Sequence, residues 1–434
     1  MELGEYTPRL VDGRLQELFE QLPALLITGP RAAGKTTTAE RHAKTIVRLD
    51  RAAEAGPFRD DPDVALRSLP EPVLLDEWQV VPEVLGAVKR AVDKGTGAGR
   101  FLLTGSVLGQ LDAQTWPGTG RLVHLRMWGL TASEILRTLR GRAEPFLQRL
   151  ARGDIAAFAM PSETPDLRGY VDLALRGGYP EPALELGYVA RRVWMESYLD
   201  QLLSRDVESL DGRRDPELLR RYFEALAINS AGIATDKTLH DAAGISHATA
   251  ASYERLLANL FVLDLVPAWS SNRLSRLIKA QKRYLTDPAL LATALRVDER
   301  AVMRDGGLLG RLIETFVLAQ IRPETELSSF RPRLYHLREK NGRREIDLLA
   351  ELSAGNVVAI EIKTSAAPTR GDARHLEWLR EQLGERFLGG AVLHTGPRPF
   401  VLSKRIFALP ICVLWGEGVD TRRKHDRPSK HQTT

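Results

Sequence analysis

Short apolar runs alternate with longer amphipathic stretches over the first third of the chain. The runs are rich in Leu, Val and Ile, and each is three to five residues long, which is typical of strands buried on both faces. They occupy residues 24–28, 46–49, 73–75, 100–104 and 122–125. This alternation predicts an α/β fold in which helices cover both faces of a parallel sheet.

The pattern becomes mainly helical from residue 167 to residue 275. Within this stretch, Thr235 and Ser246 are expected to be the N-caps of two short helices separated by a turn at Gly244. Two helices with this spacing are typical of a helix-turn-helix or winged-helix core. The second helix carries a single Arg, so a helix pair with no role in reading DNA is the competing interpretation.

Mixed periodicity returns after residue 276. A helix is expected at 308–321, and strands are expected at 345–349, 357–362 and 390–394. This pattern predicts a second, smaller mixed α/β domain.

A chain of 434 residues has room for about three folding units. The predicted segments are an α/β domain at 1–143, a polar linker at 144–166, a helical domain at 167–275, a mixed α/β domain at 276–418 and a disordered basic tail at 419–434. The tail is interpreted as a solvated end, and its alternative is an arm that binds nucleic acid.

Composition limits the classes of protein that fit. With 43% hydrophobic and 27% charged residues, the chain has the balance of a globular protein. The apolar run at 407–415 is far shorter than the ~20 residues of a membrane span, and the N-terminus lacks a secretion signal. A single Cys412 excludes an internal disulfide framework, so we expect a cytoplasmic location. The net charge of +5 permits nucleic acid as a partner without requiring it.

The first strand runs directly into the sequence Gly-Pro-Arg-Ala-Ala-Gly-Lys-Thr, which precedes an expected helix and forms a complete Walker A motif. Its backbone N–H groups and the helix N-terminus would cradle the phosphates of ATP. Lys35 would reach the β- and γ-phosphates, and the Thr36 hydroxyl would ligate Mg²⁺. The predicted nucleotide-binding residues are Gly29, Pro30, Arg31, Ala32, Ala33, Gly34, Lys35, Thr36 and Thr37.

The third apolar run ends in Asp76-Glu77, which has the form of a Walker B motif. Asp76 would hold Mg²⁺ in its second shell, and Glu77 would orient and deprotonate the attacking water. The next strand ends in Thr104-Gly-Ser106, where either hydroxyl could sense the γ-phosphate or merely cap the strand. A chance Gly-rich turn beside a solvated acidic pair is the alternative to the whole nucleotide site.

Arg121 follows a glycine shortly before the fifth apolar run. It could supply positive charge to a transition state, either in its own subunit or across the interface of a homo-oligomer. An exposed arginine with a structural role is the alternative.

Acidic and basic residues also gather in the C-terminal pattern. Glu361 and Lys363 are two apart on a predicted strand, so their side chains share a face. Asp347 lies as far before the intervening turn as Glu361 lies after it, which places them side by side in an antiparallel hairpin. Glu314 lies on an apolar face of the expected helix, where a charge needs a partner.

This constellation resembles the acidic-acidic-lysine pattern of the restriction-endonuclease-like superfamily. The resemblance implies a site in which Glu314, Asp347 and Glu361 hold Mg²⁺ against a phosphate while Lys363 positions or activates water. An inert ion pair between Glu361 and Lys363 is the alternative.

Across nearly its whole length the chain resembles a widespread prokaryotic family of AAA-type ATPases whose C-terminal half was catalogued as a domain of unknown function. The matching segments beyond the Walker motifs are 103–106, 120–121, 130–134, 177–181, 198–206 and 284–287. The resemblance implies an AAA-type ATPase module, a winged-helix-like middle and a restriction-nuclease-like end.

The leading hypothesis is a Mg·ATP-hydrolysing protein whose ATPase module drives or gates a nuclease-like domain that acts on DNA. The competing hypothesis is a nucleotide-controlled switch that captures a protein partner and cuts nothing. A small-molecule kinase fits less well, because Glu77 directly after Asp76 suits activation of water better than transfer to a metabolite.

Overall fold

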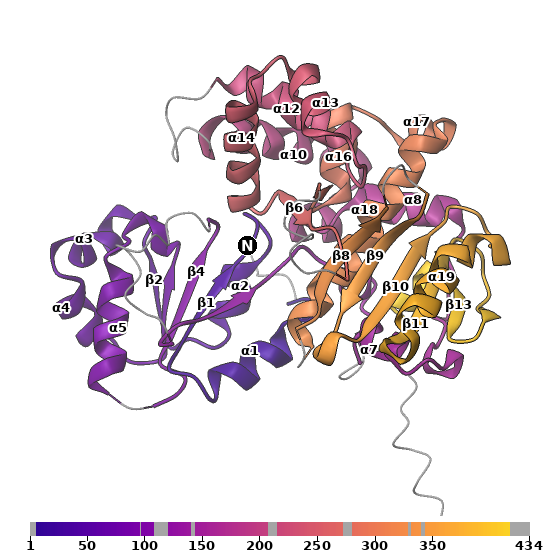
Figure 1. Ribbon diagram of the computed structural model, residues 1–434. Helices are drawn as coiled ribbons and strands as arrows, with labels where there is room; N and C mark the ends of the chain where they lie inside the picture. Colours follow the sequence, from indigo (N-terminus) through magenta and orange to yellow (C-terminus); the bar gives the residue numbers. More distant parts are fainter. Residues whose placement is uncertain are drawn as a thin grey trace, which may run out of the picture.

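A computed structural model of the chain describes residues 6–95, 97–107, 120–139, 144–206, 215–271, 280–328, 331–339 and 343–416. Figure 1 shows an N-terminal α/β unit on the left, a helical layer above, and a second sheet on the right. The tail predicted at 419–434 lies outside the described residues. In the part of the chain that is described, no helix has the length and apolarity of a membrane span.

The N-terminal sheet has five strands in the order β2-β3-β4-β1-β5, and every pairing is parallel. This confirms the predicted α/β fold. Because parallel strands end at a common edge, the loops after β1, β3 and β4 meet there. The strands are β1 (Ala24–Thr28), β2 (Thr45–Arg48), β3 (Val73–Asp76), β4 (Phe101–Gly105) and β5 (Val123–Arg126).

Helices cover both faces of this sheet because successive strand residues point to opposite sides. Leu75 and Leu103 pack in the core that contains α5, whereas their neighbours Leu74 and Leu102 pack in the core that contains α1. The surrounding elements are α1 (Asp12–Phe19), α2 (Lys35–Glu40), α3 (Ala52–Asp60), α4 (Pro62–Arg67), η1 (Trp78–Val80), α5 (Val84–Lys94) and α6 (Ala132–Ile135).

The segment predicted as a linker, 144–166, is instead folded onto the C-terminal sheet. It forms α7 (Phe146–Ala151) and η2 (Ile155–Ala157). The apolar face of α7, which includes the buried Phe146 and Leu150, packs against β10 and β11. The prediction was wrong because the flanking Pro and Gly residues concealed a short amphipathic helix.

In the middle of the chain, the helices α12, α13 and α14 precede the antiparallel pair β6-β7, which is the element order expected of a winged-helix-like region. Thr235 and Ser246 are the N-caps of α13 and α14, as expected, and Gly244 adopts the left-handed conformation between them. The elements are α8 (Leu167–Arg176), α9 (Pro180–Leu184), α10 (Tyr188–Gln201), η3 (Leu202–Asp206), α12 (Pro216–Ile228), α13 (Asp236–Ala243), α14 (His247–Asn259), β6 (Leu263–Val266), β7 (Lys282–Leu285), α16 (Pro288–Leu295) and α17 (Glu299–Arg304).

The C-terminal sheet has six strands in the order β12-β13-β11-β10-β9-β8. Its strands β8, β9 and β10 are antiparallel, and β10, β11 and β13 are parallel. Helix α19 lies on one face, and α7 and α18 lie on the other. The elements are α18 (Gly306–Leu327), β8 (Arg333–Arg338), β9 (Glu345–Glu351), η5 (Ser353–Gly355), β10 (Val357–Ile362), η6 (Arg370–Ala373), α19 (Arg374–Leu383), η7 (Gly384–Arg386), β11 (Phe387–His394), β12 (Phe400–Ser403), β13 (Ile406–Pro410) and η8 (Ile411–Leu414).

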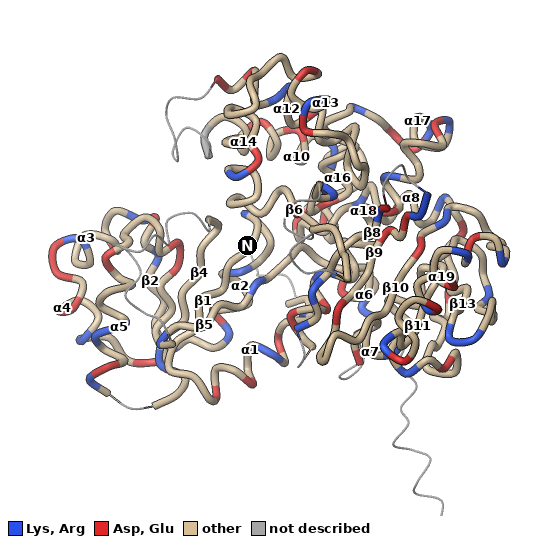
Figure 2. Tube along the Cα trace, viewed as in Figure 1, with Lys and Arg blue, Asp and Glu red and all other residues tan. Residues whose placement is uncertain are grey.

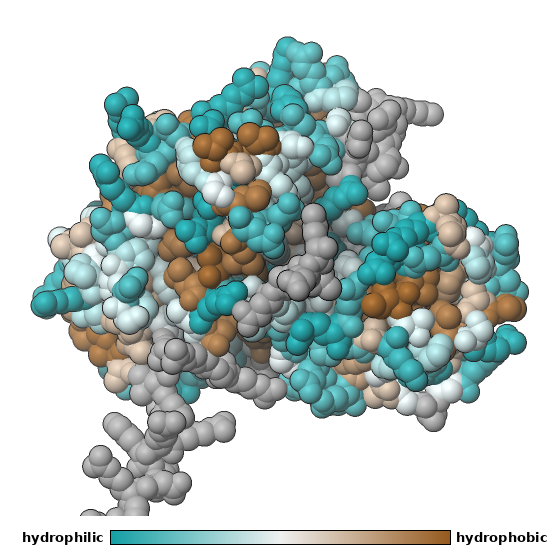
Figure 3. Space-filling model, turned by 180° about the vertical axis from the view of Figure 1, so that it is seen from behind, coloured by the Kyte–Doolittle hydropathy of each residue, from teal (hydrophilic) through white to brown (hydrophobic). Residues whose placement is uncertain are grey.

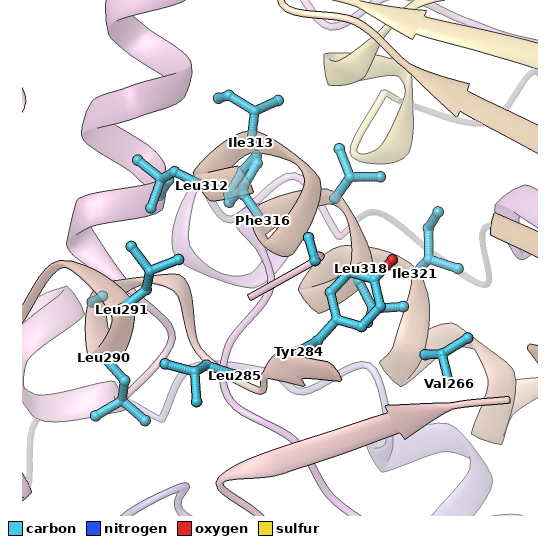
Figure 4. Packing of buried hydrophobic residues seen from close by; sticks show 14 of the residues in the cluster. Val266, Tyr284, Leu285, Leu290, Leu291, Leu312, Ile313, Phe316, Leu318 and Ile321 are labelled. Carbon is cyan, nitrogen blue, oxygen red and sulfur yellow. The ribbon is translucent and has the colours of Figure 1, made fainter. Parts of the chain in front are cut away.

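The middle and C-terminal parts share one hydrophobic core, so the boundary predicted at 275/276 does not separate two units. It falls inside the β6-β7 hairpin, whose hydrogen-bonded pairing joins Leu263 to Leu285. In Figure 4, Tyr284 and Leu285 of β7 lie beside Phe316 and Leu318 of α18. The separation of the two strands in the sequence hid their pairing from the sequence pattern.

The described surface mixes residue types. Figure 2 shows basic and acidic positions interspersed along the trace, in keeping with the net charge of +5. Seen from behind, hydrophobic residues form separate areas among hydrophilic ones (Figure 3), as is usual for a protein surface in water.

Candidate functional site

The loop between β1 and α2 carries the Walker A residues and is shaped by two glycines. Gly34 has a φ of +90°, a left-handed conformation that a side chain would strain. A Cβ on Gly29 would lie 1.9 Å from the carbonyl oxygen of Met127, so only glycine fits there. Across the loop, Lys35 Nζ donates to the carbonyl oxygen of Pro30 at 2.8 Å.

One carboxylate oxygen joins three of the predicted site residues. Asp76 Oδ1 accepts from Thr36 Oγ1 at 2.7 Å and also from Thr104 Oγ1. Asp76 ends β3 and Thr104 lies near the end of the neighbouring strand β4, so the sheet register brings them together. The Walker A threonine, the Walker B aspartate and one predicted sensor therefore converge.

Glu77 is held beside this group by the other predicted sensor. Ser106 Oγ donates to Glu77 Oε2 at 3.2 Å, and Gln79 Nε2 donates to the same oxygen. The Glu77 backbone N–H donates to Thr104 Oγ1 at 3.3 Å. Sequence reasoning missed Gln79, although its place two residues after Glu77, at the turn η1, was a usable signal.

Lys35 is buried, with only 5% of the residue exposed. Burial lowers the pKa of Lys35 to about 8, and the carboxylates of Glu77 and Asp76 oppose that shift. A nearby anion would therefore stabilise the charged ammonium, which is the condition that favours phosphate binding.

The structure does not bring Arg121 to the Walker motifs of the same chain. Arg121 precedes the amino end of β5, whereas the Walker A loop follows the carboxyl end of the parallel strand β1. Its Nε contacts Asp93 Oδ1 at 2.6 Å, and its side chain is 53% exposed. A role within its own subunit does not fit this placement, and a role across an oligomer interface stays a prediction.

Arg9 anchors the Walker A loop, and no sequence pattern indicated it. Arg9 Nη1 donates to the carbonyl of Ala33 at 2.7 Å, and Nη2 donates to that of Trp128 at 2.8 Å. Arg9 Nε donates to Glu134 Oε1 at 2.8 Å. Glu134 also accepts from the backbone N–H of Thr131 in the capping box of α6. The loop is thus tied to α6 through buried polar groups.

The helical middle also contacts the Walker A loop. The Tyr198 hydroxyl of α10 donates to the carbonyl of Arg31 at 3.3 Å. A Cβ placed on Gly34 would lie 3.5 Å from Pro180 Cγ, at the start of α9. Two helices outside the N-terminal sheet therefore pack on the loop.

In the C-terminal part of the chain, the structure brings together four predicted residues that we call the carboxylate cluster: Glu314, Asp347, Glu361 and Lys363. The expected β9-β10 hairpin is confirmed, and Asp347 Oδ2 accepts from the backbone N–H of Ile362 at 2.9 Å. Lys363 Nζ lies 3.2 Å from Glu361 Oε2. Glu314 projects from α18, and its Oε1 accepts from the Tyr284 hydroxyl at 2.6 Å.

A second lysine, Lys282 of β7, lies inside this carboxylate cluster and was missed by sequence reasoning. Its Nζ is 2.5 Å from Glu314 Oε1 and 3.4 Å from Asp347 Oδ1. Burial opposes its charge, yet these carboxylates outweigh that effect and raise the pKa of Lys282. Burial raises the pKa of Glu314 to about 7. Lys282 is part of no local sequence motif, because its partners Glu314 and Asp347 lie 32 and 65 residues away in the sequence.

Three family models match separate parts of the chain. An AAA domain model matches residues 21–136. Two models described as domains of unknown function, DUF8612 and DUF4143, match residues 167–301 and 309–414. Residues 21–136 form a P-loop domain of the AAA type.

Two mycobacterial proteins of uncharacterized function are similar to most of the chain. They are Rv2008c of Mycobacterium tuberculosis and Mb2031c of Mycobacterium bovis, each 27% identical over 403 residues, which cover 92% of this chain and 82% of the relative. A solved Walker-type ATPase of Pyrococcus abyssi, PABY2304, covers 67% of this chain and 96% of its own at 16% identity. Its TM-score of 0.42 is too low to support an inference about the fold.

Proposed function

We propose that this protein binds and hydrolyses Mg·ATP at the carboxyl edge of the N-terminal sheet. The observation that carries the proposal is the convergence on Asp76 of the hydroxyls of Thr36 and Thr104, with Glu77 as the next residue. The AAA domain match over residues 21–136 supports the same chemistry.

The residues at this edge fit a magnesium nucleotide. The left-handed backbone at Gly34 lets the loop curl around phosphates, and Lys35 supplies a positive charge at the start of α2. Thr36 and Asp76 offer the hydroxyl and carboxylate oxygens that Mg²⁺ prefers. When bound, the metal ion would neutralise phosphate charge, and these two residues would hold it.

Glu77 would act as the base that orients and deprotonates the attacking water. Its hydrogen bonds from Ser106 and Gln79 fix the carboxylate, so the base is positioned before the substrate arrives. Thr104 would act indirectly, because its hydroxyl holds the Asp76 carboxylate and the Glu77 backbone N–H in place.

The test is phosphate release from Mg·ATP, with and without double-stranded DNA. Glu77→Gln is expected to lower kcat by roughly 10²- to 10⁴-fold with ATP binding retained, because the base is removed. Lys35→Ala should abolish binding. Glu83→Gln, an exposed acid in the same region, is the matched control and should behave as wild type. ATP binding with no hydrolysis that depends on Glu77 would contradict the proposal.

The second half of the proposed function is that the ATPase drives or gates a nuclease-like C-terminal domain that associates with DNA. It is supported by the neighbouring carboxylates of Asp347 and Glu361 beside Lys363, on adjacent strands of a mixed sheet. Stimulation of hydrolysis by DNA would favour this half. DNA cuts that Glu361→Gln abolishes would favour an active nuclease.

Two observations favour the alternative, a nucleotide-controlled switch that binds a protein partner and carries an inert nuclease-like domain. The ion pairs of Lys282 already occupy Glu314 and Asp347. The contact of Tyr198 with the Walker A loop gives such a switch a direct connection between nucleotide and helical middle. ATP hydrolysis indifferent to DNA, together with intact DNA, would support it.

A further inference from the structure

We propose that Lys282 is the built-in cation of the C-terminal carboxylate cluster and that it excludes divalent metal ions from it. The inference rests on the nuclease-like half of the proposed function and deepens it. It states how that site is kept closed.

The first step is the place that Lys282 occupies. Its side chain is 1% exposed, and its Nζ faces Glu314 Oε1 at 2.5 Å and Asp347 Oδ1 at 3.4 Å. The Tyr284 hydroxyl donates to the same Glu314 oxygen. A buried ammonium with two carboxylates is a satisfied arrangement that leaves little attraction for a second cation.

The second step is what a metal ion would require. Mg²⁺ needs near-octahedral oxygen ligands at about 2.0–2.1 Å, so several carboxylates must turn toward one point. Here two of the three carboxylates turn toward Lys282. Among the residues that the structure describes, no group of three His, Cys, Asp or Glu side chains is arranged to hold a metal. The residues as they lie therefore do not fit the ion that the resemblance implies.

The third step concerns Glu361, which is 4% exposed. Its Oε2 contacts Lys363, whereas its Oε1 has no hydrogen-bond partner and lies 3.7 Å from His375 Nδ1. Glu361 Oε1 is therefore a carboxylate oxygen available to ligate a metal ion. With Lys282 removed, it could join Glu314 and Asp347 in holding a divalent ion.

The fourth step is the origin of the lysine. Lys282 lies on β7, and the carboxylates come from α18, β9 and β10. The next residue, Arg283, faces the other way and pairs with Glu254 of α14 and Asp236 of α13. The winged-helix-like region therefore supplies the cation and holds the strand that carries it.

The test is Mn²⁺ binding measured by electron paramagnetic resonance without nucleotide or DNA, in an Asp76→Asn background that silences the Walker site. The parent protein is expected to bind no Mn²⁺ at this cluster. Lys282→Met, which keeps the side-chain bulk, should bind one additional Mn²⁺ per chain. Adding Asp347→Asn should remove that ion. Mn²⁺ bound by the parent and lost with Asp347→Asn would overturn the proposal, as would no gain in Lys282→Met.

Lys282→Met leaves two partly buried carboxylates without their cation and is expected to lower the stability of the fold, so a second pair of measurements is needed. Mn²⁺ should raise the Tm of Lys282→Met and leave the Tm of the parent unchanged. The variant Lys282→Gln keeps a hydrogen-bond donor near Glu314 and all three carboxylates, and it should also gain Mn²⁺ binding. A Tm of Lys282→Met that Mn²⁺ leaves unchanged, or no gain of Mn²⁺ in Lys282→Gln, would count against the proposal. ATP hydrolysis in the Asp76 wild-type background reports on the first half of the proposed function independently.

Discussion

Buried side chains that reach backbone carbonyls give the nucleotide site its shape at the residue scale. Arg9 uses three N–H groups on three acceptors, and only its planar fork can reach all of them at once. One acceptor, the Ala33 carbonyl, belongs to the Walker A loop. The stability of the loop therefore depends on a residue outside the Walker A motif.

Replacing Arg9 by Lys tests this dependence. The charge opposite Glu134 is kept, but most of the hydrogen bonds are lost, so we expect unfolding to become easier by about 2–4 kcal/mol and ATP binding to weaken. Urea unfolding and nucleotide titration measure the two effects. The control is Arg90→Lys, whose partner Asp63 is on the surface. It should cost less than about 0.5 kcal/mol. Equal costs for the two variants would contradict the anchoring role of Arg9.

The distance in sequence between partners explains which site residues could be predicted. The Walker A residues are contiguous, and Asp347 and Glu361 follow from the register of one hairpin, so local patterns were sufficient. Arg9 lies 125 residues from Glu134, and no local pattern indicated it. Lys282 was missed for the same reason. Tertiary packing decides such contacts, and a single sequence does not encode them as a motif.

At the element scale, α10 connects the helical middle to the Walker A loop. It is 14 residues long, and Tyr198 near its C-terminal end is almost buried, whereas Tyr188 at its first position is 51% exposed. Trp194 stacks on Tyr198 with ring centroids 5.2 Å apart. The aromatic packing holds the hydroxyl of Tyr198 over the loop.

Tyr198→Phe is expected to weaken ATP binding by about five-fold, because the hydrogen bond that fixes the Arg31 carbonyl is worth about 1 kcal/mol. Fluorescence titration with a labelled nucleotide measures the change. Tyr188→Phe removes a hydroxyl from the same helix and should bind as wild type. If both variants bind alike, α10 does not set the loop conformation.

At the scale of the whole molecule, α18 links the two sheets. Gln320 Oε1 accepts from the backbone N–H of Ala132 in α6 at 2.7 Å, and Glu314 on the same helix lies in the carboxylate cluster. Because Arg9 and Glu134 tie α6 to the Walker A loop, a continuous set of hydrogen bonds runs from one site toward the other. The division into separate domains predicted from the sequence did not include this helix as a connector.

Gln320→Leu is expected to disconnect the two sites. In the wild type, a non-hydrolysable ATP analogue should slow backbone hydrogen exchange in α6 and in α18. In the variant, the effect should persist in α6 and be lost in α18. Gly310→Ala is a matched change in α18, where an added Cβ meets nothing within 4 Å, and it should preserve the wild-type pattern. If the ATP analogue does not change backbone hydrogen exchange in α18 of the wild type, the link is refuted.

The placement of Lys282 has a consequence for how this chain can be inherited. The stretches that match DUF8612 and DUF4143 end at residue 301 and begin at residue 309, so Lys282 falls in one and Glu314 and Asp347 fall in the other. A recombination event between the two stretches would leave two partly buried carboxylates without their cation and split a common core. The two stretches should therefore be passed on together, as one unit of descent.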